Sequence, residues 1–144
     1  MTTIKKIPTR RRPKMNLDQI KSNLVDQDKG RWLQLVNPWD NTPIGLSLLI
    51  AGPDSETQNK ARIAMMDELA DAADATGKVS FEGREKARVN CLARCVLNWD
   101  VAADFGLDAK FGHAAVVKVL QVAWIQHQVD AFAADRANFR SEVA

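Results

Sequence analysis

The stretch that most constrains the fold runs from Arg84 to Asp100, REKARVNCLARCVLNWD. Apolar residues recur in it at spacings of three and four, which is the pattern of one face of an α-helix. They are Val89, Leu92, Val96 and Trp99. No Gly or Pro interrupts the stretch, and a helix with so wide an apolar face must bury it against other elements. The sequence therefore predicts a central helix here, with Trp99 in the core and the neighbouring segments packed around it.

A chain of 144 residues is long enough for one domain with a real core. No apolar run approaches the ~20 residues that span a bilayer, and the apolar stretch of a secretory signal does not follow the basic N-terminus. The two cysteines, Cys91 and Cys95, are fewer than a disulfide-stapled secreted domain usually carries. These features predict a cytoplasmic protein without membrane contact.

Residues 1–14 form a basic arm that carries six positive charges and no acid. The charged residues are Lys5, Lys6, Arg10, Arg11, Arg12 and Lys14. Because the whole chain has 20 basic and 18 acidic residues, the part after the arm has more acids than bases. Charge repulsion and two prolines argue against a helix in the arm. Such an arm could bind the phosphates of a nucleic acid, dock on an acidic protein surface or simply aid solubility.

Residues 15–30 predict a short amphipathic helix that ends at Gly30. Its apolar positions are Leu17, Ile20, Leu24 and Val25. They predict packing on the domain or on a neighbouring subunit. The chain then changes to a period of two, with apolar residues at Ile44, Leu46, Leu48 and Ile50. This alternation predicts a β-hairpin with strands at about 31–36 and 44–51.

The turn-rich loop of this hairpin, NPWDNTP, contains Trp39. A tryptophan in such a loop either folds back on the hairpin or stays exposed as an anchor for a partner protein. Folding back is the commoner arrangement. Trp39 is nevertheless a candidate partner-binding residue, together with the six charges of the basic arm.

The sequence SETQ at Ser55–Gln58 has the S-x-x-Q pattern of a capping box and predicts a helix that ends near Gly77. Its predicted apolar stripe is Ile63, Met66, Leu69, Ala70 and Ala73. The C-terminal segment predicts one long helix or two, over 112–125 and 125–138. The predicted fold is α+β and mostly helical. Residues 1–30 form the basic arm and short helix, and residues 31–144 form a single domain in which the hairpin precedes a three- or four-helix bundle.

The sequence contains no P-loop, G-x-G-x-x-G, G-x-S-x-G or H-E-x-x-H motif. Asp67, Asp71 and Asp74 share one helical face and could bind a cation, although such a cluster is more often a solvated surface. We therefore expect no catalytic activity and no cofactor.

The two cysteines are the nearest approach to a metal site. Cys91 and Cys95, at positions i and i+4, could supply half of a tetrahedral zinc site. His113 and His127 would have to complete it, but their spacing matches no zinc finger or ribbon. Two small buried hydrophobic side chains are the favoured interpretation. A metal-dependent enzyme built on these cysteines is the least favoured alternative.

The order of four segments suggests a family. A strand ending in Asn37-Pro38 precedes TPIGLSLLIAGPDSETQNKAR, and a helix ending in LNWD follows at residues 97–100. Phe111 then leads a final helix, which closes with DRANF at residues 135–139. Over about residues 31–139 this order resembles small tail-assembly chaperones and minor structural proteins from the morphogenesis modules of tailed bacteriophages. Residues 1–30 and the segment 101–110 depart from the pattern of those proteins.

The resemblance implies a non-catalytic phage protein that works through protein–protein contacts, either as an assembly chaperone or as a component of the virion. It would act in the host cytoplasm during assembly. Its partners would be other phage structural proteins or copies of itself, with the basic arm as an assembly strap. The alternative is a nucleic-acid-binding accessory protein that uses the same arm. The two hypotheses differ in whether the arm binds protein or phosphate.

Overall fold

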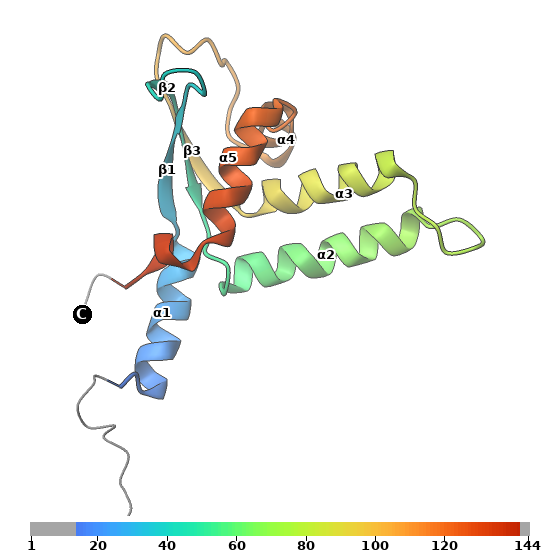
Figure 1. Ribbon diagram of the computed structural model, residues 1–144, viewed down its shortest axis with the longest axis horizontal. Helices are drawn as coiled ribbons and strands as arrows, with labels where there is room; N and C mark the ends of the chain where they lie inside the picture. The colour runs from blue at the N-terminus through green and yellow to red at the C-terminus, as the bar shows by residue number, and fades with distance from the viewer. Residues whose placement is uncertain (1–13, 142–144) are drawn as a thin grey trace, which may run out of the picture.

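The computed structural model describes residues 14–141, which form a mixed α+β structure (Figure 1). The elements in chain order are α1 (Leu17–Lys29), β1 (Arg31–Val36), β2 (Pro43–Ile50), α2 (Glu56–Ala72), α3 (Phe81–Arg94), β3 (Val96–Val101), α4 (His113–Val119), α5 (Ala123–Ala134) and the 3-10 helix η2 (Arg136–Phe139). Within residues 14–141, no helix is both long and apolar enough to cross a membrane.

The predicted hairpin is confirmed. Strands β1 and β2 pair antiparallel, with Leu33 opposite Leu48, and β2 lies in the middle of a three-stranded sheet of order β1-β2-β3. The alternation in β2 has the expected effect, because every second residue from Leu46 to Ile50 is buried. The predicted helix over residues 15–30 is also confirmed as α1, which ends at Gly30.

The predicted central helix is wrong in its last turns. Helix α3 ends at Arg94, and the LNWD segment belongs to strand β3, which pairs with β2 so that Trp99 lies opposite Leu48. The same residues also have a period of two, because Leu97, Trp99 and Val101 alternate with Asn98 and Asp100. A two-stranded hairpin is only marginally stable, so pairing with β2 favours the strand over two further helical turns.

The change of element also moves Trp99. The prediction that Trp99 is buried in the core is wrong, because its side chain is only half-buried. It packs edge-on against Phe111, with ring centroids 5.6 Å apart. The fully buried residues come instead from the inner face of the sheet and from the helices over it. The largest are Leu35, Leu46, Leu48, Ile50, Val116, Leu120, Val129 and Phe139.

The predicted three- or four-helix bundle is also wrong in its arrangement. Helices α3, α4 and α5 lie on the same side of the sheet. Helix α3 also runs side by side with α2, and this pair projects away from the sheet (Figure 1). The burial of α2 differs from the prediction, since Ile63 and Met66 are exposed and Gln58 and Ala61 are buried. The helix also ends earlier than Gly77, at Ala72.

The C-terminal segment forms two helices, the second of the two alternatives. The break falls at Leu120–Val122, earlier than the predicted position at 125. Leu120 is fully buried at this break, where it caps α4 in an αR conformation. The chain therefore turns at a residue that anchors it in the core.

Candidate protein-interaction surfaces

The β1–β2 loop holds Trp39 in a rigid, exposed position. Two backbone hydrogen bonds close the loop, from the Asn37 N–H to the Thr42 carbonyl and from the Asn41 N–H to the Asn37 carbonyl, both at 2.8 Å. The Asn37 side chain accepts from the Trp39 N–H at 2.9 Å, and Asp40 accepts from both the N–H and the hydroxyl of Thr42. The loop is thus ordered before any partner arrives.

The Trp39 side chain is 82% exposed and touches one other aromatic ring. That ring is Trp124 at the start of α5, which it meets edge-on with ring centroids 6.4 Å apart. Folding back on the hairpin would have buried the indole, so the structure agrees with the exposed alternative. A large rigid aromatic side chain that costs little entropy on binding is the residue type most enriched among interface hot spots.

The other candidate partner-binding residues lie elsewhere. Lys14 is exposed just before α1. Helix α1 lies at the opposite end of the sheet from the β1–β2 loop (Figure 1). Lys5, Lys6, Arg10, Arg11 and Arg12 lie outside the described residues.

Comparison with protein-family models, with curated proteins and with solved structures found no match to this chain.

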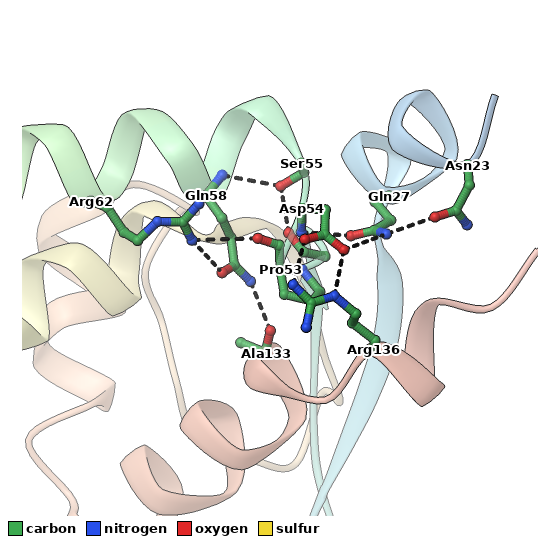
Figure 2. A network of polar contacts seen from close by, with 10 residues as sticks. Asn23, Gln27, Pro53, Asp54, Ser55, Gln58, Arg62, Ala133 and Arg136 are labelled. Atoms are coloured by element: carbon green, nitrogen blue, oxygen red, sulfur yellow. Dashed lines mark hydrogen bonds and ion pairs between the residues drawn. The ribbon is translucent and has the colours of Figure 1, made fainter. Parts of the chain in front are cut away.

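Helix α1 is attached to the domain by its polar side. Gln27 is its one fully buried residue, and the Gln27 side chain accepts from the Asp54 N–H at 2.8 Å (Figure 2). The backbone carbonyl of Gln27 accepts from the N–H groups of Gly30 and Gly52. Gly52 packs so closely on Gln27 that an added Cβ would lie 2.5 Å from the Gln27 Oε1 atom. These polar contacts fix the orientation of the helix.

Asp28 makes a second connection, because it caps the first turn of α2. Its carboxylate accepts from the N–H groups of Glu56 and Thr57 at 3.1 and 3.0 Å and from the Thr57 hydroxyl at 2.8 Å. Partial burial acts to raise the pKa of Asp28, but these hydrogen bonds outweigh it and hold the pKa below the ordinary value.

A buried amide links three elements at the same junction (Figure 2). The Gln58 side chain donates to the carbonyls of Ala51, after β2, and Ala133, in α5, at 2.8 and 2.9 Å. The predicted capping box is therefore only half formed, since Ser55 accepts from the Gln58 N–H but the Gln58 side chain does not return to Ser55. Nearby, Arg136 forms a bidentate pair with Asp54, and its hydrogen bonds lower the pKa of Asp54.

The acidic residues of α2 and of the turn after it have different surroundings. Asp67 and Asp71 are exposed on the helix, and Asp74 caps the turn that follows by accepting from Thr76 and Lys78. The structural carboxylate is Glu68, which pairs with Arg94 at 2.7 Å across the α2–α3 contact. Within residues 14–141, no three His, Cys, Asp or Glu side chains gather closely enough to hold a metal ion.

The two cysteines are free thiols with different surroundings. Cys95 is buried, and its thiol donates to the Cys91 carbonyl at 3.3 Å, whereas Cys91 is partly exposed. The neighbouring Cys95 side chain lowers the pKa of Cys91 to about 7 by a side-chain hydrogen bond distinct from the bond to the Cys91 carbonyl, and Arg94 contributes in the same direction. That side-chain hydrogen bond, together with burial, raises the pKa of Cys95. His113 lies near Asn90, and His127 is exposed on α5.

The sequence pattern missed the role of the polar residues Gln27 and Gln58. A buried glutamine has no characteristic spacing, and its partners here are backbone groups far away in the chain. The pattern also indicated an apolar stripe on α1 without indicating which side of the helix the domain would use. Both depend on tertiary contacts.

Proposed function

We propose that this chain is a non-catalytic structural or assembly protein of a tailed bacteriophage that works through protein–protein contacts. The Trp39 loop is its main docking element, and the basic arm of residues 1–14 is an assembly strap. The observation that carries the contact function is the 82% exposure of Trp39 on a loop that five hydrogen bonds hold in place.

The residues behind the phage resemblance have structural roles in this fold. Asp135 caps η2 by accepting from the Ala137 N–H at 3.0 Å, Arg136 pairs with Asp54, and Phe139 is 1% exposed. Phe111 packs on Trp99. These contacts stabilise a small scaffold. A stable scaffold is what a loop needs in order to be presented to a partner, and this supports a binding role.

The test is complementation in the phage-producing host after the gene is deleted. Wild-type protein, Trp39→Ala and Trp32→Ala are supplied, and tailed particles are counted by electron microscopy and infectious titre. Trp32 is the matched control, because it is 50% exposed on the other side of the sheet from the helices. We expect Trp39→Ala to lower the titre at least tenfold at an unchanged melting temperature, with Trp32→Ala near wild type. Full titre with Trp39→Ala would overturn the proposal.

The nucleic-acid alternative is separated by deleting residues 1–14. A strap predicts that the deleted protein folds but no longer joins its assembly. A phosphate-binding arm predicts instead that DNA binding disappears on deletion. In the intact protein it predicts that log affinity falls with log salt at a slope of about −0.9 per phosphate contact. Normal assembly of the deleted protein together with loss of DNA binding would favour the alternative.

A further inference from the structure

Helix α1 is held on the domain almost without apolar burial. Its one buried residue is Gln27. Its apolar residues are between 37% and 62% exposed, namely Leu17, Ile20, Leu24 and Val25. Helices α4 and α5, by contrast, bury apolar side chains almost completely, as at Val116 and Val129. Because burial of apolar surface is the main favourable contribution to folding, α1 lacks the contribution that fixes α4 and α5.

Polar contacts hold α1 instead, and they gather in its second half (Figure 2). In the described part of the chain, the hydrogen bonds and ion pairs of α1 with other elements come from residues 23–28. Gln27 accepts from the N–H groups of Gly52 and Asp54 at 2.9 and 2.8 Å. Asp28 accepts from the first turn of α2. The attachment of α1 is therefore a short row of hydrogen bonds.

The attachment is weak for two further reasons. Residues 17–22 are exposed, and this half of the helix projects beyond the end of the sheet (Figure 1). A helix of 13 residues is also only marginally stable alone in water. Hydrogen bonds add little net stability to such a junction, because water replaces them when the junction opens. Segments with few buried apolar contacts open at a lower free energy than the whole domain.

We propose that α1 is a latch, which opens from the domain as one unit while the sheet and helices α2–α5 stay folded. Gly30, between α1 and β1, is the hinge, since glycine tolerates a wide range of backbone angles. The helix is about 20 Å long, so opening displaces its start by a similar distance. The basic arm directly precedes this start and moves with it. The opening does not depend on the phage proposal, but within that proposal it sets the reach of the strap.

Two adjacent backbone amides distinguish the open latch from the closed one. The Ala51 N–H donates to the Cys95 carbonyl at 2.9 Å. The Gly52 N–H donates to the Gln27 carbonyl, also at 2.9 Å, and both donor residues are buried. Only Gly52 has its acceptor on α1. Opening of the latch therefore frees the Gly52 N–H and leaves the Ala51 N–H bonded.

The first experiment measures amide hydrogen exchange of the full chain by NMR and compares protection factors. We expect the protection factor of Gly52 to be at least about tenfold lower than that of Ala51. The amides of Glu56 and Thr57, which donate to Asp28, should exchange through the same opening and be no better protected than Gly52. If α1 only frayed at its exposed end, Gly52 and Ala51 would have equal protection, and that result would overturn the proposal.

A second experiment tests the part that Gln27 plays in holding the latch closed. Gln27→Ala removes the side-chain acceptor of the Asp54 N–H but keeps the backbone carbonyl that Gly52 uses. We expect this variant to lower the protection of Gly52 at least about fivefold further, with Ala51 unchanged. Lys21→Ala is the matched control, since Lys21 is exposed on the first half of the same helix, and it should change neither amide. A Gln27→Ala variant that changed Gly52 and Ala51 alike would overturn the proposal.

Discussion

Gln128 of α5 closes part of the free edge of β1. Its side-chain amide accepts a hydrogen bond from the Val36 N–H at 3.0 Å and donates one to the Val36 carbonyl at 2.8 Å. The amide thus makes the two hydrogen bonds that a neighbouring strand would make at this position. Edge strands with unpaired backbone groups invite association with other chains, and this contact protects the end of β1.

Replacing Gln128 should therefore destabilise the protein. Gln128→Ala leaves two backbone groups of a half-buried residue without a partner, at an expected cost of about 1–2 kcal/mol in the free energy of unfolding. Urea denaturation measures this cost. His127→Ala, at the exposed neighbouring position, is the control and should cost less than about 0.5 kcal/mol. Equal midpoints for the two variants would contradict the role of the amide.

The two phenylalanines at opposite extremes of burial give a matched pair. Phe139 is 1% exposed and packs edge-on against Phe132, whereas Phe81 is 84% exposed. Phe139→Ala should cost about 3–5 kcal/mol, the range for buried aromatic residues, and Phe81→Ala about 0.5 kcal/mol from its contact with Arg84. Thermal and urea unfolding measure both. A small effect of Phe139→Ala would mean that η2 is not part of the core.

Gly30 and Gly77 should differ in how much they resist replacement. Both have positive φ, +82° and +85°, so alanine is strained at either position, and the ψ of 173° at Gly30 lies in a region that is essentially confined to glycine. At Gly30 the new Cβ would also lie 2.9 Å from the Ile50 carbonyl oxygen, whereas at Gly77 nothing lies within 4 Å. Gly30→Ala should therefore cost about 1–2 kcal/mol more than Gly77→Ala in urea denaturation. Equal costs would argue against the close approach of α1 to the sheet.

Glu68 should make stability depend on pH. The hydrogen bond from Arg94 lowers the pKa of Glu68, against the effect of partial burial, and Asn90 adds to the lowering. Because the folded pKa lies below the unfolded value of about 4.3, the stabilisation is present above that pH and is lost as the pH falls through the folded pKa.

The test compares urea midpoints between pH 7 and pH 3. Glu68→Gln should lower stability at pH 7 by about 1 kcal/mol or less, because both partners are partly exposed, and should reduce the loss on acidification. Asp67→Asn removes an exposed carboxylate of the same helix and leaves that pair intact. If Glu68→Gln lost stability on acidification as steeply as wild type, the Glu68–Arg94 pair would not be the cause.

Cys91 should be the more reactive thiol. It is partly exposed with a pKa of about 7, while Cys95 is buried with a raised pKa. The rate of alkylation by iodoacetamide, followed by peptide mass spectrometry, should therefore rise with a midpoint near pH 7 at Cys91. Cys95→Ala should move the midpoint upward. Preferential modification of Cys95 in the folded protein would contradict this assignment.

Local patterns in the sequence were sufficient for several elements. The alternation from Ile44 to Ile50 and the repeat from Leu17 to Val25 predicted β2 and α1 correctly, and the Ser55 cap marked the start of α2. Such features depend on neighbours within a few residues. Trp39 was also found as a candidate from the turn-rich loop around it, although its exposure had to come from the structure.

Long-range contacts decided the rest. Residues 96–101 fit both a helical and a strand period, and only the presence of β2 as a partner made them β3. The repeat in α1 indicated an apolar stripe, but hydrogen bonds of Gln27 and Asp28 with residues 52–57 turned that stripe outward. The amphipathic pattern was therefore encoded by the sequence of α1 alone, whereas its orientation was decided by polar partners some 25 residues further along the chain.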